Sequence, residues 1–234
     1  MNKNVNWTAI TILIIAVLSI GSIFLMKSLN KDNNNQEDKE QTEHRQEPID
    51  HNKVLNYEQQ PMLGNENAKI KVAEFSDYKC PACKYFTEEI FPQLKEDYID
   101  TGKIQFYSLN LKFIGQDSKK AALIGEAIYQ QNNDAYWKYN ELIYKHQDEK
   151  EQVWASTDFL YNLIQENIPE IKIEQLKEDV EKNEIAQNVE QDTTAAETLQ
   201  LQGTPALYIN GVEVEDSMNY DSIKQALDRE LEQQ

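Results

Sequence analysis

The chain has 234 residues and a formal net charge of −18, and 27% of its residues are charged. Such an acidic surface repels the phosphate backbone of nucleic acids, so nucleic-acid binding is excluded as the leading function. The charge is consistent with solubility, and a preference for basic or unfolded substrate chains is the alternative.

Residues 1–27 contain a run without any charged side chain, from Trp7 to Met26. A helix of this length spans the hydrocarbon core of a bilayer. A cleaved signal peptide is the alternative, but its apolar region is usually shorter and ends in a small-x-small site, which is missing here. We therefore expect an uncleaved signal anchor, which is a single-pass transmembrane helix in the cell membrane. The rest of the chain is expected on the extracytoplasmic side.

Residues 28–60 are polar and of low complexity, most clearly from Lys31 to Glu40. A segment with nothing apolar to bury stays unfolded, so we predict a flexible tether that holds the domain off the membrane. A short edge strand is expected at residues 54–57, and a turn at residues 61–65. The remainder has the length of one globular domain of roughly 170 residues.

Residues 70–75 form the first clear strand pattern, and apolar residues after position 85 recur at helical spacing up to residue 100. Pro92 lies inside this expected helix and should kink it, and Gly102 closes it. Residues 104–109 alternate between apolar and polar side chains, as a second strand does. The order β-α-β predicts a pair of parallel strands.

Between the first strand and the helix lie Cys80 and Cys83, which are the only cysteines of the chain. Cys80 should therefore begin the helix, where unpaired N–H groups and the positive end of the helix dipole stabilise a thiolate. Pro81 takes the first helical position, where its missing N–H is harmless. Cys83 follows one turn later and can attack a mixed disulfide formed at Cys80. The spacing predicts a redox pair with Cys80 as nucleophile and Cys83 as resolving thiol.

From residue 117 to residue 201 the chain shows no strand pattern, and its apolar spacing predicts five consecutive helices. Asp117-Ser118, Asp134 and Ser156 are expected to cap the first three, and Gly203 to close the last. Aromatic residues in this stretch are expected to pack in the core, with a substrate-facing subset as the alternative. They are Tyr129, Tyr136, Trp137, Tyr139, Tyr144 and Trp154.

The strand pattern returns at residues 203–214, where Asn210-Gly211 separates two alternating runs, as the central residues of a hairpin turn do. Residues 220–231 carry apolar side chains four residues apart and predict a closing helix. The helical stretch is thus expected between two parts of one sheet.

These pieces, in this order, resemble the thioredoxin superfamily and, within it, the DsbA-like thiol–disulfide oxidoreductases with their membrane-anchored, Gram-positive BdbD group. The resemblance covers residues 61–232. It rests on the strand before the cysteines, the C-x-x-C motif, the helical block, and a late Thr-Pro that opens a strand. The matching residues are Gly64, Ala68, Ile70 to Tyr78, Cys80-Pro81-Ala82-Cys83, Thr204-Pro205 and Asn210-Gly211.

The resemblance implies an α/β protein with a thioredoxin-like fold. A helical domain is inserted between the two halves of the sheet, and an N-terminal transmembrane helix precedes them. The expected segments are the signal anchor at 1–27, the tether at 28–60, the first half of the thioredoxin-like domain at 61–115, the helical insertion at 116–202, and the second half at 203–234.

By the same resemblance, Pro205 is a cis-proline that packs against the redox pair, and Thr204 precedes it. An exposed backbone edge beside Cys80 would then pair with an extended substrate peptide. Glu74 matches the buried acid of the family, whose pKa is raised by burial, and would relay a proton to or from Cys83. Because side chains alternate along a strand, a Glu74 that only faces solvent is the alternative.

The active-site dipeptide Pro81-Ala82 differs from the Pro-His of the family's strongest oxidase, because Ala82 brings no side-chain donor to the Cys80 thiolate. We therefore predict a pair that is less oxidising than that oxidase and more oxidising than thioredoxin, whose dipeptide is Gly-Pro. Lys79 and Lys84 flank the cysteines. They would partly compensate for the missing donor, unless both are merely solvated.

The leading hypothesis is an enzyme that introduces disulfide bonds into reduced or unfolded secreted or surface proteins. The resemblance implies that a membrane quinone-linked thiol oxidase of the DsbB or BdbC type re-oxidises it, with no cofactor besides the Cys80–Cys83 disulfide. A reductase or isomerase of the same fold is the alternative enzyme, although the tether is too short and polar to be the dimerisation domain of the family's isomerases.

Two hypotheses come from other classes of protein. A zinc module would need four ligands, and the chain offers one C-x-x-C and three distant histidines, so no metal site is predicted. A non-catalytic, membrane-tethered binding module would keep the cysteines as a structural disulfide. A bridge that closes so short a loop constrains the unfolded chain little.

Overall fold

The structure is a computed structural model that describes residues 49–147 and 154–233. The expected signal anchor and the part of the tether before residue 49 lie outside these residues. Within them, no helix is both long enough and apolar enough to cross a membrane.

A five-stranded mixed sheet has the strand order β1-β3-β2-β4-β5. The central strands β2 and β3 are parallel, in register from the pair Ile70 and Ile104 to the pair Asp77 and Leu111. All other neighbours are antiparallel. The strands are β1 (Met62–Gly64), β2 (Ile70–Asp77), β3 (Ile104–Leu111), β4 (Ala206–Ile209) and β5 (Val212–Glu213). The predicted β-α-β unit is confirmed.

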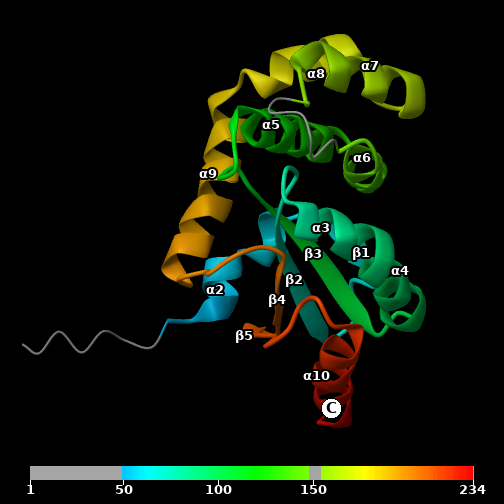
Figure 1. Cartoon of the computed structure of the whole chain (residues 1–234), viewed down its shortest axis with the longest axis vertical. Helices are drawn as coiled ribbons and strands as arrows, with labels where there is room; N and C mark the ends of the chain where they lie inside the picture. The colour runs from blue at the N-terminus through cyan, green and yellow to red at the C-terminus, as the bar shows by residue number, and fades with distance from the viewer. Residues whose placement is uncertain (1–48, 148–153, 234) are drawn as a thin grey trace, which may run out of the picture. The chain divides into compact units, whose positions relative to one another are not determined.

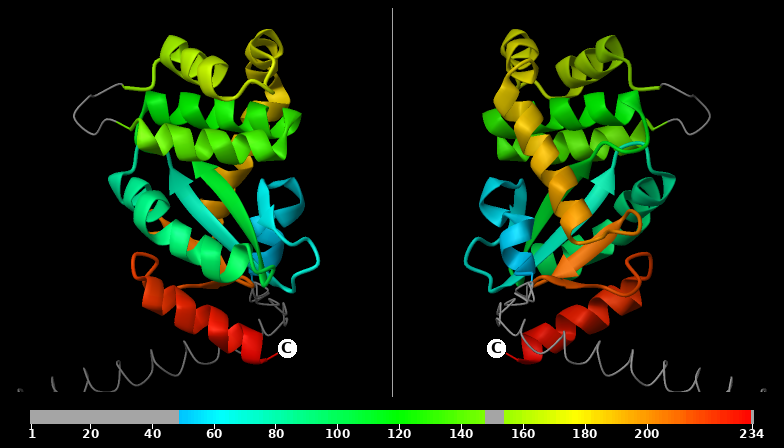
Figure 2. Two further views of the ribbon diagram at one scale, coloured as in Figure 1. Left: turned by 90° about the vertical axis from the view of Figure 1, so that its right-hand side faces the viewer. Right: turned by 90° about the vertical axis from the view of Figure 1, so that its left-hand side faces the viewer.

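Helices cover the sheet, and a group of them lies beyond one end of it (Figure 1). The arrowheads of β2 and β3 point towards α5 and α6 in Figure 2, and α9 returns from this group along the sheet to α2. The α-helices are α2 (His51–Leu55), α3 (Pro81–Tyr85), α4 (Phe91–Leu94), α5 (Gln116–Gln131), α6 (Asn133–Lys145), α7 (Thr157–Asn167), α8 (Ile173–Val180), α9 (Asn183–Thr198) and α10 (Tyr220–Glu232). Segments of other helix types are the 3-10 turn η1 (Tyr57–Gln59) and the π segments η2 (Phe86–Ile90) and η3 (Lys95–Ile99).

Both faces of the sheet are covered, because alternate side chains of β2 point to opposite sides and all except Lys71 are buried. Ile70 and Val72 belong to a core cluster with residues of α4 and α10. Ala73 and Phe75 belong to a second cluster with residues of α2 and α9. A third cluster joins α3 to helices α5–α8 and contains both cysteines. The cysteine pair therefore lies between the end of the sheet and the helical group.

Residues 49–60 are folded, so the predictions of a tether up to residue 60 and of an edge strand at 54–57 are wrong. Asp50 begins α2, where its side chain accepts a hydrogen bond from the N–H of Lys53. Asn56 ends the helix in the left-handed region, with φ 43°. A helix of five residues gives no readable periodicity, and contacts with the rest of the molecule stabilise it.

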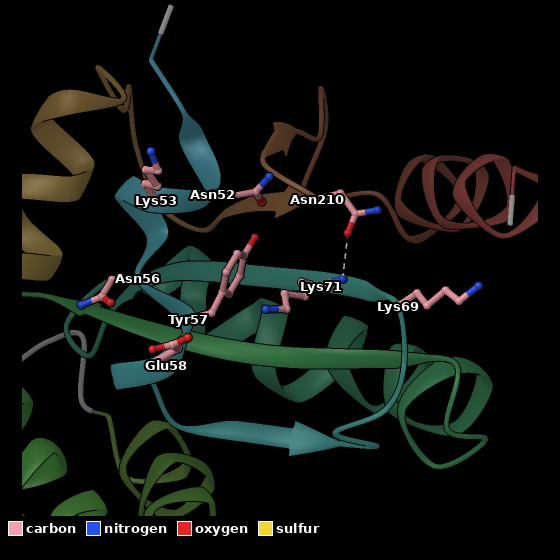
Figure 3. Close-up of a pocket in the computed structure, with 8 residues that line it drawn as sticks. All are labelled: Asn52, Lys53, Asn56, Tyr57, Glu58, Lys69, Lys71 and Asn210. Carbon is pink, nitrogen blue, oxygen red and sulfur yellow. Dashed lines mark hydrogen bonds between the residues drawn. The ribbon is translucent and has the colours of Figure 1, made fainter.

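Those contacts come from Leu55 and Tyr57, which are buried against β2 and β3. Figure 3 shows Tyr57 beside Lys71, whose ammonium lies 4.8 Å from the centre of the ring. The side-chain oxygen of Asn210 accepts a hydrogen bond of 2.9 Å from the N–H of Lys71. Residues 49–60 therefore belong to the folded domain.

The turn expected at residues 61–65 contains the edge strand β1, which pairs with β3. The turn was predicted here because glycine, at position 64, is typical of turns. The φ of 106° at Gly64 favours glycine, and a Cβ at this position would lie 2.5 Å from the carbonyl oxygen of Ile104. The glycine thus serves a close approach of two backbones.

The helix after the cysteines is not a uniform α-helix with a kink at Pro92. The π segment η2 precedes the proline, which then lies in the first turn of α4. The N–H of Phe91 still bonds to the carbonyl of Phe86 in the π pattern, and the change to the α pattern falls at the proline, which has no N–H to donate.

The five helices predicted between residues 117 and 201 are confirmed, but only one of the predicted caps is right. Ser156 caps α7. Asp117 lies inside the first turn of α5 and is buried, and Asn132 rather than Asp134 caps α6. The last helix, α9, ends before Gly203. Several polar residues in a row leave the capping position ambiguous in the sequence.

The C-terminal elements are as predicted. β4 and β5 pair as a hairpin, and the turn residues Asn210 and Gly211 have φ values of 48° and 82°. Two central residues with positive φ are typical of the turn that matches the twist of a hairpin. The closing helix α10 follows.

Candidate active site

Cys80 lies between the end of β2 and the start of α3, as the sequence predicts. It is the N-cap residue of α3, and Pro81 follows at the start of the helix. The N–H of Cys80 donates a hydrogen bond of 2.9 Å to the carbonyl of Asp77, the last residue of β2. Both cysteines are thiols in this structure. The backbone thus presents the Cys80 sulfur to the N–H groups that begin the helix.

Several donors converge on the Cys80 sulfur and favour its thiolate. The S–H of Cys83 contributes most, and together these donors lower the Cys80 pKa to about 5, although burial opposes them. The side chain of Thr204 and the backbone N–H groups of Cys83 and Ala82 also lower this pKa. Hydrogen bonds to the charged form of a group favour that form. The sequence predicts the backbone donors but not the S–H or the hydroxyl.

Cys83 has the opposite electrostatic character. It is fully buried, whereas Cys80 keeps 8% of its surface exposed. Burial, followed by the hydrogen bond to Cys80 and by the negative charges of Cys80 and Glu74, raises the pKa of Cys83. One thiol is therefore ionised and reachable, and the other is neutral and enclosed. Such a pair has an attacking and a resolving member.

Glu74 lies on β2 and is only 4% exposed, so the alternative of a solvent-facing side chain is wrong. Burial and the negative charge of Cys80 raise its pKa to about 8. Its Oε1 atom has no hydrogen-bond partner among the described residues. Glu74 also contributes to the raised pKa of Cys83. A carboxyl that is neutral near pH 7 is thus placed to exchange a proton with the cysteine pair.

Thr204 and Pro205 reach Cys80 from the other half of the sheet. The peptide bond between them is cis, as the resemblance implies. β4 begins directly after them and pairs with β2, so that Ala206 lies opposite Phe75. The Cys80 sulfur lies 3.4 Å from the carbonyl oxygen of Thr204, to which it donates a hydrogen bond when it is protonated. The sheet thus brings together residues that are 124 positions apart.

Sequence reasoning missed the role of Asp77. Its carboxylate accepts hydrogen bonds of 2.9 Å from the N–H of Lys79 and of Phe113, and a third of 3.2 Å from the N–H of Ile114. These bonds fix the turn before Cys80 and the loop after β3. A polar residue at the end of an apolar strand was the available signal, since such residues often accept backbone bonds of the following turn.

The two flanking lysines are engaged elsewhere. Lys79 pairs with the buried carboxylate of Asp117 at 3.0 Å. Lys84 donates a hydrogen bond of 3.1 Å to the carbonyl of Gln147. The main stabilisation of the Cys80 thiolate therefore comes from the S–H, hydroxyl and N–H donors described above.

Figure 3 shows the residues around a surface hollow of about 570 Å³, and neither cysteine lines it. It is lined by Tyr57 and Lys71, among others, and lies at the start of β2, whereas Cys80 follows the end of that strand. Across residues 49–147 and 154–233, no three His, Cys, Asp or Glu side chains gather to hold a metal ion.

Comparison with known proteins adds independent observations. The family model described as Thioredoxin matches residues 56–229. The "Probable disulfide bond formation protein D" of Bacillus anthracis is 41% identical over 180 residues, which are 77% of this chain and 82% of that protein. The "Disulfide bond formation protein D" of Bacillus subtilis is 37% identical over 172 residues, 74% of this chain and 77% of that protein. The crystal structure of oxidised BdbD from Bacillus subtilis has a TM-score of 0.70 at 36% identity and covers 75% of this chain and 94% of that one.

The chain belongs to the thioredoxin superfamily and to its DsbA-like thiol–disulfide oxidoreductases. The resemblance seen in the sequence, with the BdbD group, is confirmed. The fold is shared more widely, because DsbA of Chlamydia trachomatis has a TM-score of 0.66 at only 22% identity. As a member of this family, the chain is a thiol–disulfide oxidoreductase that forms disulfide bonds.

Proposed function

We propose that this oxidoreductase introduces disulfide bonds into reduced secreted or surface proteins on the extracytoplasmic side of the cell membrane. The disulfide that it donates is the one between Cys80 and Cys83. The observation that carries this proposal is the opposite ionisation of the two thiols, with the pKa of Cys80 at about 5 and that of Cys83 raised. A stable Cys80 thiolate favours the reduced pair, which makes the disulfide a strong oxidant.

The reaction begins with the pair as a disulfide. A substrate thiolate attacks the Cys80 sulfur, the bond to Cys83 breaks, and a mixed disulfide joins the substrate to Cys80. Cys83 leaves as a thiolate and takes up a proton, for which the neutral carboxyl of Glu74 is the proposed donor. A second substrate thiolate then attacks the substrate sulfur of the mixed disulfide, and Cys80 leaves as a thiolate. The substrate dithiol is oxidised, and the enzyme disulfide is reduced to a thiolate at Cys80 and a thiol at Cys83.

The low pKa of Cys80 accelerates the second step, since a thiol of lower pKa is a better leaving group. Thr204 and Pro205 are proposed to hold the substrate. The backbone beside them would pair with an extended peptide and bring its sulfur to Cys80. The open side of Cys80 and the closed position of Cys83 direct the first attack to Cys80.

A new disulfide must be supplied after each cycle. We propose a membrane quinone-linked thiol oxidase of the DsbB or BdbC type as this source, with no bound cofactor besides the cysteine pair. The apolar run of residues 7–26 would keep the enzyme at the same membrane as a signal anchor.

The potential of the pair decides between an oxidase and a reductase. The full-length protein in detergent is equilibrated with glutathione buffers, and the state of Cys80 and Cys83 is followed by alkylation. We expect a potential above that of thioredoxin, which is about −270 mV, and below that of the strongest DsbA-type oxidase, at about −120 mV. A value equal to that of thioredoxin supports the reductase instead.

Single-cysteine variants test the order of attack. Cys83→Ser should accumulate mixed disulfides with a secretory substrate that is supplied in its oxidised form, because the Cys80 thiolate breaks the substrate disulfide and no resolving thiol remains to release it. Cys80→Ser should form none and should not oxidise the reduced substrate. Equal amounts of mixed disulfide with both variants would contradict the assigned roles.

A further inference from the structure

One side chain of the helical group reaches the active-site turn and has no part in the proposed chemistry. Gln147 follows α6 and is 5% exposed. Its Nε2 donates a hydrogen bond of 2.7 Å to the carbonyl of Tyr78 and another of 3.2 Å to the carbonyl of Cys80. Two carbonyl oxygens can be met only by the nitrogen of the amide, which fixes its orientation.

We infer that Gln147 is a positioning residue of the redox site. It holds the peptide groups on both sides of the turn that carries Cys80, so that the N–H groups of α3 remain directed at the Cys80 sulfur. The inference rests on the proposed role of Cys80 as the nucleophile. It assigns to the inserted helices a direct share in setting the reactivity of that thiol.

The hydrogen bonds around Gln147 restrict the movement of the turn that carries Cys80. Tyr78 is fully buried, so its carbonyl depends on a protein donor. The carbonyl of Cys80 also accepts the helical bond of 3.1 Å from the N–H of Lys84, so Gln147 adds a second donor there. Lys84 adds a further link between α3 and Gln147, because its ammonium donates a hydrogen bond to the carbonyl of Gln147. The turn and the first turn of α3 are thereby tied to one residue of the helical group.

The position of the peptide planes matters because the N–H groups of Ala82 and Cys83 lower the pKa of Cys80. These donors lie on the two residues after Pro81, directly beyond the carbonyl that Gln147 holds. A rotation of the peptide that follows Cys80 would turn them away from the sulfur. Removal of the amide should therefore destabilise the thiolate without touching it.

The first variant is Gln147→Leu, which keeps the volume and removes both hydrogen bonds. We expect the Cys80 pKa of the reduced protein to rise by about one unit, because a hydrogen bond to a charged group is weakened. The readout is the ultraviolet absorbance of the thiolate as a function of pH. At pH 7 this corresponds to a disulfide about tenfold harder to reduce, or a potential lower by about 30 mV.

Gln147→Glu gives a second, nearly isosteric change. Its carboxylate cannot donate to the two carbonyls and adds a negative charge beside the turn, so the Cys80 pKa should rise further than in the leucine variant. Both variants leave the other ionisable groups around the turn in place, which are Glu74, Asp77, Tyr78, Lys79, Cys83, Lys84, Asp117 and Tyr144.

Gln105→Leu is the matched control. Gln105 is also buried, and its Nε2 donates to two backbone carbonyls, those of Glu66 at 3.1 Å and Ala68 at 2.5 Å, at the other end of β3. It should lower the thermal stability as much as Gln147→Leu but leave the Cys80 titration and the potential as in the wild type.

The outcomes separate this inference from the proposed function. A wild-type Cys80 that titrates like a free thiol defeats the proposed function itself. A low wild-type pKa that stays unchanged in both Gln147 variants defeats only the inference. An equal shift in Gln105→Leu would also overturn it, because the effect would then come from a general loss of stability.

Discussion

At the scale of single residues, the site shows how two identical side chains acquire opposite chemistry. Cys80 begins a helix and accepts hydrogen bonds from several donors, whereas Cys83 is enclosed and is itself the main donor. Each thiol therefore shifts the pKa of the other in the useful direction. The asymmetry arises from position along one helical turn, since a residue at the start meets free N–H groups and a residue inside does not.

Thr204→Val tests the hydroxyl donor to Cys80. The variant keeps the shape of the side chain but removes one hydrogen bond to the thiolate, so the Cys80 pKa should rise by about one unit. Thiolate absorbance against pH measures it. Thr194→Val, which removes a hydroxyl bonded to the carbonyl of Glu190 on the surface of α9, is the control and should leave the titration unchanged. An unchanged titration in Thr204→Val would show that the Thr204 hydroxyl does not stabilise the Cys80 thiolate.

Glu74→Gln tests the buried acid. The folded protein keeps the proton of Glu74 up to a pKa of about 8, whereas the unfolded chain releases it near the ordinary value of 4.5. The free energy of unfolding therefore falls as the pH rises between these values. Relative to Glu74→Gln, the reduced wild type should lose about 3 kcal/mol between pH 4 and pH 7.

Denaturant unfolding of the two reduced proteins at a series of pH values measures this difference. A change at a surface acid, Glu89→Gln, should give a curve parallel to that of the wild type. Parallel curves for Glu74→Gln as well would mean that Glu74 is ionised in the folded protein, and it would then have no proton to give to Cys83.

At the scale of elements, the sequence predicts the strands and helices that are long and the turn that has a characteristic pair of residues. The strands β2 and β3, the hairpin at Asn210-Gly211 and the five inserted helices all carry a repeated apolar pattern or a turn signal. The short elements α2 and β1 were not predicted. Their stability comes from contacts with β2 and β3, which no local pattern encodes.

The same distinction applies to the site. Cys80, Cys83 and Pro205 carry a motif, so sequence reasoning finds them. The burial of Glu74 could not be predicted from the sequence, because it depends on whether one face or both faces of β2 are covered. The contacts of Thr204 and Gln147 with the active-site turn join segments that are far apart in the chain, and no spacing rule reveals them.

Leu55→Ala tests whether α2 is part of the domain. Leu55 is fully buried, and truncation of a buried leucine to alanine costs about 2–5 kcal/mol. The thermal midpoint of unfolding should therefore fall clearly, as measured by calorimetry. Lys53→Ala in the same helix is the control, because its side chain is 85% exposed and should cost little. If both variants melted like the wild type, residues 49–60 would not contribute to the fold.

At the scale of the whole molecule, the redox state should control stability through Cys80. Its pKa is about 5 in the folded protein and 9.0 in an unperturbed thiol. The stability that the thiolate contributes is thus fully present above pH 9 and is lost as the pH falls through 5. The oxidised protein lacks this contribution because its Cys80 carries no charge.

The reduced protein should therefore gain stability over the oxidised protein as the pH rises from 5 to 9. Denaturant unfolding of both forms at each pH gives the difference, in which Glu74 largely cancels because both forms contain it. In Thr204→Val the gain should start at a higher pH. A difference that does not change with pH would contradict the low pKa of Cys80.

The strand pairing that brings Thr204 to Cys80 has a consequence for biogenesis. A ribosome makes the chain from its N-terminus, so Cys80 is synthesised well before Thr204, which lies 124 positions further along the chain. Until β4 pairs with β2, Cys80 has the donors of its own helical turn but not the Thr204 hydroxyl, so the stabilisation of its thiolate is completed only when the last part of the sheet has formed.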